Sequence, residues 1–231
     1  MHVTAVLVAY NREELLREAL AALTTQTRPA DRLIVVDNAS EDGSAAVAER
    51  ALQAWGGNGE LIRLAENTGG AGGFAVGVAA AVTEPGTDWV WVMDDDTVPS
   101  PGALEAALAA HARYCATGPD NLAVMGSRVL WTDGEDHPMN TPKAKIGAGR
   151  AERQRAAQVG ALEIRSISFV SAFLRADRVR EVGLPIVDYF LWNDDFEYSA
   201  RLLRGARGLF VPGSVVTHKT KIRGSSDQDP G

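Results

Sequence analysis

The sequence predicts an α/β protein built on a mainly parallel sheet with helices on both faces. Residues 1–98 alternate short apolar runs with stretches whose apolar residues recur at helical spacing. Polar residues and glycines follow the apolar runs, where the strands of such a sheet would end. This alternation is typical of parallel sheets that bind ligands at the carboxyl ends of their strands. Residues 99–231 follow the pattern less regularly, so we expect a modified C-terminal half within one domain, 1–231.

The first half is expected to contain four strands and three helices in strict alternation. Strands are predicted at residues 3–9, 32–36, 60–64 and 88–93, because these runs are short and apolar. Asn11 is expected to cap the first helix, whose apolar positions run from Leu15 to Leu23. Further helices are predicted at 44–55 and at 74–82, the second after a glycine-rich turn.

The second half is expected to be more varied. Helices are predicted at 103–114 and 194–203, and strands at 123–130, 164–174, 208–211 and 215–216. The polar stretch 132–158 is too long for a tight connection, so it predicts either a mobile functional loop or partial disorder. The tail at 225–231 is expected to fray.

Composition narrows the class of protein. The chain has 231 residues, of which 45% are hydrophobic and 23% charged, as in ordinary globular domains. A net charge of −7 argues against a protein that coats nucleic acid. A single cysteine cannot form an internal disulfide, and neither a signal peptide nor a membrane-spanning run is evident. We therefore expect a cytoplasmic protein, with peripheral attachment to the inner face of the plasma membrane left open.

The sharpest motif is the acid triplet Asp94-Asp95-Asp96, directly after the apolar run WVWVM. Such a triplet can be a solvated loop. It can also hold a hard divalent cation, since Asp94 and Asp96 lie on the same side of an extended chain and offer oxygen ligands. Mg²⁺ or Mn²⁺ bound in this way usually also takes phosphate oxygens.

Other polar groups follow the neighbouring strands. Asp37 and Asn38 end the second strand, where the Asn38 amide is either a turn former or able to read a ribose or a base edge. The glycine-rich run at 67–73 would let a backbone approach a phosphate at a helix N-terminus. The same run supports a rival hypothesis, because Gly70, Gly72 and Ala75 match the G-x-G-x-x-A fingerprint of NAD(P)-binding oxidoreductases. Against it, the fingerprint should follow the first strand of its unit.

A second acidic site is predicted at the start of the last helix. Asp194 and Asp195 either serve only to favour the helix N-terminus or include a general base beside a sugar platform formed by Trp192. Since adjacent side chains point in different directions, only one of the two acids is expected to face a substrate. His218 follows an apolar run and is a candidate metal ligand, whereas His111 and His137 are expected to be structural.

Taken in order, VAYNR, VVDNASED, ENTGGAGG, VMDDDT, WNDDFEY and THK resemble the inverting GT-A glycosyltransferases of family 2 over nearly the whole chain. The set is most similar to bacterial galactofuranosyltransferases that use UDP-galactofuranose, with rhamnosyltransferases that use dTDP-rhamnose next. A non-catalytic nucleotide-sugar-binding module is a third possibility. The resemblance implies Mn²⁺ or Mg²⁺, and a glycan or lipid-linked glycan as acceptor. Known galactofuran polymerases carry extra domains, and the stretch 132–158 has no clear counterpart.

The resemblance also implies roles for individual residues. Residues 1–98 would bind the nucleotide sugar and residues 99–231 would bind the acceptor and catalyse transfer. Asp37 would contact the base in a pocket lined by Ala9 and Arg12, while Asn67 and Gly70 would lie along the ribose and diphosphate. Asn38, Asp94 and Asp95 are assigned to the donor as well. Asp96 and His218 would ligate the metal, Asp195 would be the general base, and Asp194 and Trp192 would position the acceptor.

Overall fold

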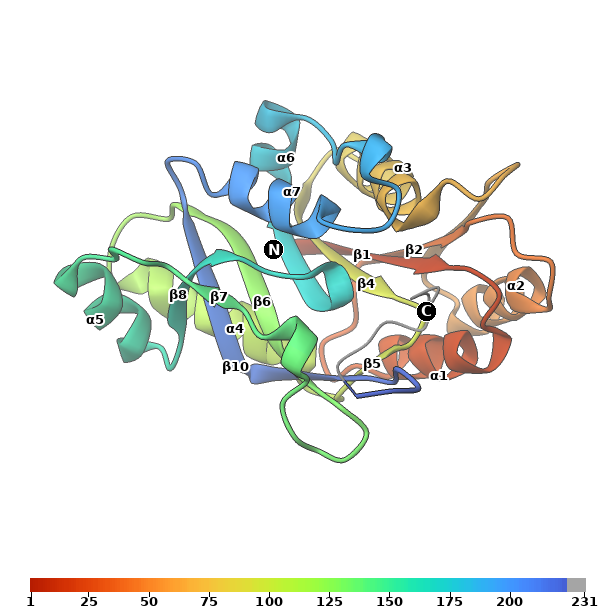
Figure 1. Ribbon diagram of the computed structural model, residues 1–231, viewed down its shortest axis with the longest axis horizontal. Coiled ribbons are helices and arrows are strands. Elements are labelled where there is room, and N and C mark those ends of the chain that lie inside the picture. Colours follow the sequence, from red (N-terminus) through yellow and green to blue (C-terminus); the bar gives the residue numbers. More distant parts are fainter. Residues whose placement is uncertain (224–231) are drawn as a thin grey trace.

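The computed structural model describes residues 1–223 and shows one continuous mixed sheet flanked by helices (Figure 1). The strand order is β3-β2-β1-β4-β9-β6-β10-β8-β7, and β5 pairs with β10 outside this path. The four strands β3, β2, β1 and β4 run parallel to one another. Strand β9 lies antiparallel between β4 and β6, so it joins the two halves of the chain in one sheet.

The first half has the predicted alternation of strands and helices. Its elements are β1 (His2–Ala9), α1 (Glu13–Thr24), β2 (Arg32–Asp37), α2 (Ser44–Trp55), β3 (Asn58–Arg63), α3 (Gly69–Thr83) and β4 (Thr87–Asp94). Helices α1 and α2 pack on one face of the sheet and α3 on the other, as Figure 1 shows. All seven predicted elements are therefore confirmed, α2 with the predicted bounds and the others with shifted ends.

Two details of the first half differ from expectation. Asn11 does not cap α1: its φ is 51°, and its side-chain oxygen accepts a hydrogen bond from the Glu41 N–H at 2.7 Å. Helix α3 begins five residues early and includes most of the glycine-rich run. Because Gly73 and Gly77 lack side chains, this helix lies close against Val8 and Val6 of β1, where a Cβ atom would collide.

The second half is more regular than predicted. Its longer elements are α4 (Ala103–Ala116), β6 (Leu122–Leu130), α5 (Arg150–Gln158), β8 (Leu162–Ser166), α6 (Ala176–Val182), α7 (Asp194–Leu202) and β10 (Arg207–His218). Its short elements are β5 (Thr97–Pro99), β7 (Lys143–Ala144), β9 (Ala172–Arg175) and the 3₁₀ turns η1 (Pro138–Asn140), η2 (Phe169–Ser171) and η3 (Val187–Tyr189). The expected tail at 225–231 lies outside the described residues.

Three predictions for this half were wrong in their boundaries. The strand expected at 164–174 is divided into β8 and β9 by η2, because Ile167 leaves the sheet and its N–H bonds to Ser199 Oγ. The two strands expected at 208–211 and 215–216 are one strand, β10, which absorbs Pro212 and Gly213 in an irregularity between Val211 and Val215.

The stretch 132–158 is folded, contrary to the expectation of a mobile or disordered loop. It contains η1, β7 and α5. Helix α5 is fixed by Arg155, whose guanidinium lies 3.6 Å from the centre of the Tyr114 ring and donates a hydrogen bond to the Tyr114 carbonyl. Contacts between distant parts of the chain thus order a segment that has no apolar periodicity of its own.

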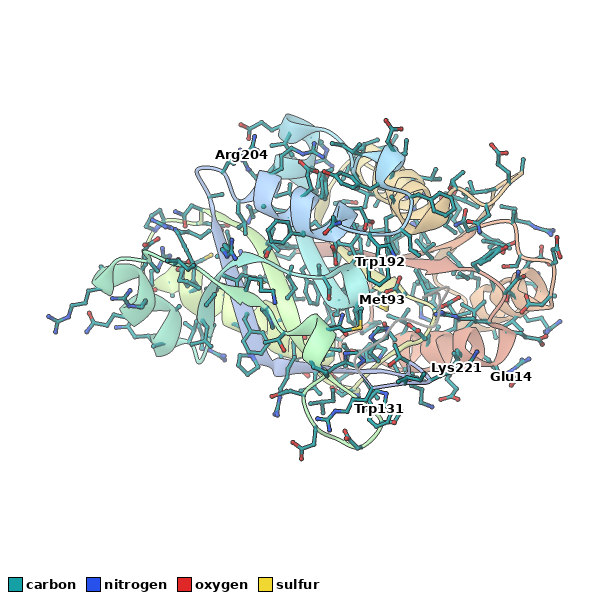
Figure 2. The ribbon with its side chains drawn as sticks, in the orientation of Figure 1. Glu14, Met93, Trp131, Trp192, Arg204 and Lys221 are labelled. Carbon is teal, nitrogen blue, oxygen red and sulfur yellow. The ribbon has the colours of Figure 1, made fainter. Side chains whose placement is uncertain are left out.

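Side chains from both helical layers fill the space against the sheet (Figure 2). One layer includes α1, α2 and α4, and the other α3, α6 and α7. Within residues 1–223, no helix is both long and apolar enough to cross a bilayer. The carboxyl ends of β1, β2 and β4 share one edge of the sheet, and there the polar motifs meet.

Candidate active site

The acid triplet and His218 lie side by side although most of the chain separates them. Strand β5 pairs antiparallel with the end of β10, which places Thr97 opposite His218. The Lys219 N–H donates to the Asp96 carbonyl at 2.9 Å and extends this pairing. As a result, ligand atoms of Asp94, Asp96 and His218 all lie within 4.8 Å of one another. The structure therefore brings together Asp96 and His218, the ligands that the resemblance implies, and Asp94, which the acid triplet had already offered as a ligand.

The three groups shift one another's ionisation. Burial disfavours the ionised form of Asp96, but His218 and Arg12 outweigh it and hold the Asp96 pKa below its usual range. Burial, with the neighbouring charge of Asp96, raises the pKa of Asp94 to about 7. Burial opposes the charged form of His218, yet the Asp96 carboxylate raises its pKa. The cluster thus concentrates negative charge that a cation would stabilise.

The donor set fits a divalent cation. Asp96 Oδ1 is buried and faces His218 Nε2 at 3.1 Å without a well-aligned hydrogen bond. His218 Nδ1 lies 2.9 Å from the Asn140 Oδ1 atom, which leaves Nε2 directed at the acids. Two carboxylates and one imidazole nitrogen are ligands that Mn²⁺ accepts, and Mg²⁺ would use mainly the oxygens.

Arg12 lies with the acids. Its Nη1 atom is 2.7 Å from Asp96 Oδ2 and 3.2 Å from Asp95 Oδ1. Asp95 also accepts the Tyr10 N–H at 2.9 Å, and its burial raises its pKa to about 7 despite Arg12. Asp95 thus faces the end of β1 and is not among the three clustered ligands.

The remaining donor-side residues lie around the end of β2. Asn38 donates to Asn67 Oδ1 at 2.9 Å and to the Gly69 carbonyl at 3.0 Å, so its amide joins β2 to the turn before α3. Asp37 is buried and accepts the Ser40 N–H at 3.1 Å. The buried Ala9 carbonyl accepts the Asn38 N–H at 2.9 Å. These contacts are structural, and they leave the predicted contacts with a nucleotide untested.

Most of the predicted site residues line two neighbouring cavities. The larger, about 320 Å³, is lined by both predicted sites, including Asp94, Asp96, His218, Trp192, Asp194 and Asp195. The smaller, about 70 Å³, is lined by donor-side residues, including Asn38, Asn67, Asp94 and Asp95. Arg12 and Gly70 line both cavities, whereas Ala9 and Asp37 line neither. The two predicted sites are therefore parts of one cleft.

The paired acids at the start of α7 differ in environment. Asp194 is 6% exposed, and burial together with the charge of Asp195 raises its pKa to about 7. Burial also raises the pKa of Asp195, but the N–H groups of Phe196 and Phe169 favour its ionised form. Asp195 is more open than Asp194, and it lines a further small cavity beside Phe196. Trp192, at 47% exposure, lies on the wall of the larger cavity.

Two residues beside His218 were not predicted to belong to the site. Asn140 bonds to it, as described, and the buried His137 ring lies 4.9 Å from the His218 ring, centre to centre. His137 was expected to be structural, and its Nε2 atom lies 3.0 Å from Thr220 Oγ1. His111 packs edge-on against Trp89, away from the cleft.

The glycine run does not form the turn that a dinucleotide fingerprint needs. Gly70 and Gly72 lie inside α3, and α3 follows the third strand of the chain. This placement weakens the oxidoreductase hypothesis.

Comparison with known proteins agrees with the geometry. The sequence model of "Glycosyl transferase family 2" matches residues 4–177. Galactofuranosyltransferase GlfT1 of Mycobacterium tuberculosis H37Rv is 32% identical over 209 residues, which are 87% of this chain and 64% of that protein. The chain thus spans less than two thirds of the length of this relative.

Solved structures show the same fold at low sequence identity. GalNAc-T7 with UDP, GalNAc and Mn²⁺ superposes with a TM-score of 0.75 at 15% identity, covering all of this chain and 46% of that one. TarS of S. aureus superposes with a TM-score of 0.71 at 16% identity, covering 95% of this chain and 37% of that one. The predicted GT-A fold is therefore confirmed, and with three quarters of its length matched by the family model, the chain belongs to glycosyl transferase family 2.

Proposed function

We propose that this chain catalyses metal-dependent, inverting transfer of galactofuranose from UDP-galactofuranose to a hydroxyl group of a glycan or lipid-linked glycan. One observation carries the proposal: a cation-binding cluster and a carboxylate pair line the same cavity. The similarity to galactofuranosyltransferases supports the choice of sugar. Rhamnosyl transfer from dTDP-rhamnose is the alternative, because the cleft geometry does not distinguish the two donors.

In this proposal Asp94, Asp96 and His218 would hold the Mn²⁺ or Mg²⁺ ion. When bound, the ion supplies Lewis-acid charge that stabilises the departing nucleotide diphosphate, so no general acid is needed. The similar fold of GalNAc-T7, solved with UDP and Mn²⁺, supports this requirement. Arg12, which bonds to Asp95 and Asp96, would partly neutralise the negative charge of these acids when a diphosphate binds beside them.

Asp195 would accept the proton of the attacking acceptor hydroxyl at a carboxylate oxygen. A single displacement inverts the anomeric carbon and needs only one base on the opposite side of the sugar. Burial raises the pKa of Asp195 although backbone N–H groups oppose it, and a raised pKa makes the carboxylate a stronger proton acceptor. The more buried Asp194 would orient the acceptor beside it, and Trp192 would offer its ring to a sugar face.

The two halves of the chain would divide the substrates. Residues 1–98 would bind the donor, with Asp37, Ala9 and Arg12 near the base and Asn67 and Gly70 along the ribose and diphosphate. Residues 99–231 would bind the acceptor.

The proposed acceptor is consistent with an exposed apolar rim beside the cleft. Large apolar side chains between 184 and 196 are 39–52% exposed: Leu184, Ile186, Val187, Tyr189, Phe190, Trp192 and Phe196. A rim of this kind would suit the lipid part of a lipid-linked acceptor. We further propose a cytoplasmic location, in which this rim would make peripheral contact with the inner face of the plasma membrane.

The test is thermal-shift binding with UDP and dTDP, each with Mn²⁺ or EDTA, followed by measurement of nucleotide release from the matching sugar donors. Metal-dependent stabilisation by UDP and release of UDP from UDP-galactofuranose are expected. A preference for dTDP would favour rhamnosyl transfer. Binding of the nucleotide without its release from the sugar donor, whichever acceptor is added, would favour a non-catalytic nucleotide-sugar-binding module. No response to nucleotides, with a shift caused by NAD(H), would overturn the proposal.

A further inference from the structure

The candidate metal ligand His218 is held from behind by a residue outside the cation cluster. The His218 Nδ1 atom lies 2.9 Å from Asn140 Oδ1, and both side chains are buried, at 8% and 7% exposure. On the other side, Asn140 Nδ2 donates to Ser168 Oγ at 3.1 Å. In this orientation the amide presents its oxygen to His218 Nδ1. That oxygen can only accept, so the contact calls for a proton on Nδ1.

This tautomer is the one that a metal ligand needs. With the proton on Nδ1, the ring directs Nε2 at Asp96 Oδ1, 3.1 Å away, inside the cation cluster. A metal-bound histidine usually donates its other N–H to an acceptor that fixes the ring, and loss of that acceptor typically costs roughly 10–100-fold in metal affinity. Asn140 occupies the position of this acceptor.

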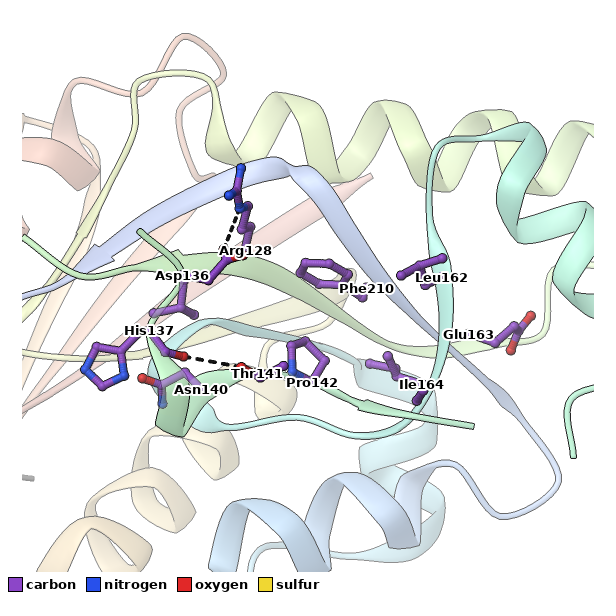
Figure 3. A pocket seen from close by; sticks show the side chains of 12 residues that line it. Arg128, Asp136, His137, Asn140, Thr141, Pro142, Leu162, Glu163, Ile164 and Phe210 are labelled. Atoms are coloured by element: carbon purple, nitrogen blue, oxygen red, sulfur yellow. Dashed lines mark hydrogen bonds and ion pairs between the residues drawn. The ribbon is translucent and has the colours of Figure 1, made fainter. Parts of the chain in front are cut away.

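The turn that carries Asn140 is itself anchored to the residues after His218. Trp131 Nε1 donates to the Thr220 carbonyl at 3.0 Å, and His137 Nε2 lies 3.0 Å from Thr220 Oγ1. The Asn140 N–H closes η1 on the His137 carbonyl at 3.1 Å. Figure 3 shows His137 and Asn140 projecting from this turn at one end of a separate cavity of about 160 Å³. Trp131, His137 and Asn140 thus all contact residues 218–220.

The same amide reaches the base side of the cleft. Ser168, its second partner, precedes Phe169, whose N–H favours the ionised form of Asp195. One side chain thus bridges the segment that carries the metal ligand and the segment that supports the proposed base.

We propose that Asn140 is a positioning residue for the divalent-metal site: it fixes the His218 ring with the proton on Nδ1 and Nε2 toward Asp96. This inference rests on the proposed function, because it assigns Asn140 to the metal site of that function. It also assigns a role to the stretch 132–158, which neither the predicted donor site nor the predicted base includes.

The experiment measures Mn²⁺ affinity by the electron paramagnetic resonance of free Mn²⁺, with saturating UDP, for the wild type and three variants. Asn140→Ala removes the acceptor and is expected to weaken Mn²⁺ binding roughly 10–100-fold. Asn140→Asp keeps an acceptor at the same place and is expected to bind Mn²⁺ at least as tightly as the wild type. Thr141→Ala is the matched control: the Thr141 hydroxyl lies within hydrogen-bond distance of the His137 and Pro138 carbonyls, and this variant should bind Mn²⁺ as the wild type does.

A second measurement is independent of metal and of the variants' folding. In the wild type with EDTA, nitrogen-15 NMR of the histidine rings above the His218 pKa should show His218 protonated on Nδ1. Protonation on Nε2, or Mn²⁺ affinity in Asn140→Ala within twofold of the wild type, would overturn the inference.

A further variant separates this inference from the proposed function. His218→Ala should lose Mn²⁺ binding. If it does while Asn140→Ala binds normally, only the role of Asn140 is wrong. If the wild type itself binds no Mn²⁺ with any nucleotide, the metal-dependent function fails and the inference fails with it.

Discussion

The two acids at the start of α7 allow a sharp test of the proposed mechanism, because each can be replaced by its isosteric amide. In Asp195→Asn the new side-chain oxygen can still accept the Phe196 N–H, which lies 2.6 Å from the Asp195 carboxylate. The helix start should therefore persist, and the loss is confined to proton acceptance. General-base catalysis contributes about 10²–10⁴-fold, so kcat should fall by that factor, or roughly 3–5 kcal/mol in the activation free energy.

Asp194→Asn should have a much smaller effect. Since its pKa is raised to about 7, Asp194 is roughly half protonated at pH 7 in the folded protein, and the amide imitates the protonated form. We expect kcat to change by less than about tenfold, with the larger effect on the KM for the acceptor. The proton acceptor itself, Asp195, would be untouched.

The assay is the initial rate of UDP release from the donor with acceptor present, over a range of acceptor concentrations. Circular dichroism and the Tm of each variant serve as controls for folding. Turnover of Asp195→Asn near that of the wild type would refute the assignment of the base. A reversed pair, in which Asp194→Asn loses 10²–10⁴-fold and Asp195→Asn does not, would transfer the role to Asp194.

Three further predictions concern stability. The pKa of Asp194 rises from 3.8 to about 7 on folding, so between these pH values the folded state binds more protons than the unfolded state, and stability is lost as pH rises through 7. The Tm measured with EDTA should therefore fall less from pH 5 to 8 in Asp194→Asn than in the wild type. Parallel curves of Tm against pH would contradict this prediction. Ser171→Ala should lower the free energy of unfolding in urea by about 1–3 kcal/mol, because the fully buried Trp91 Nε1, which lies 3.0 Å from Ser171 Oγ, would lose its hydrogen-bond partner. A loss below about 0.5 kcal/mol would contradict this prediction. Gly69→Ala should destabilise more than Gly86→Ala: both have positive φ, at roughly 1–2 kcal/mol of strain, but only at Gly69 would the new Cβ also collide with a carbonyl of the loop before α7. Equal costs would mean that the loop moves aside freely.

The parts of the fold that were predictable are those set by neighbours in the sequence. Strand β1 and helix α2 show their apolar pattern within one short window, so periodicity alone locates them. The start of α3 was not predictable in this way, because a glycine run has weak helix propensity and is helical here through its packing on β1. Asn11 resembled a helix cap, yet a partner thirty residues away takes its side chain.

The candidate site, like the fold, has residues that a local sequence pattern reveals and residues that only distant contacts bring together. The acid triplet stands out because three charges directly follow an apolar strand, and Asp195 because a family pattern surrounds it. Asn140 has no such signal: it lies in a polar stretch, and it meets His218 only after β10 has joined the sheet. A role that arises from contact between segments 78 positions apart is invisible to any local pattern.

The pairing of β5 with β10 makes assembly of the cation cluster depend on β10. Strands β1 to β4 and their helices all lie within residues 2–94, although β1 pairs with β4 at the far end of this segment. Asp96, however, contacts His218 only when β10 has paired with β5. A chain interrupted anywhere between Asp96 and His218 would lack the complete cation cluster, and one interrupted before Phe190 would also lack part of the lining of the donor-side cavity. Copies that end before β10 should therefore lack the proposed metal-dependent activity, because β10 supplies one of the three clustered ligands.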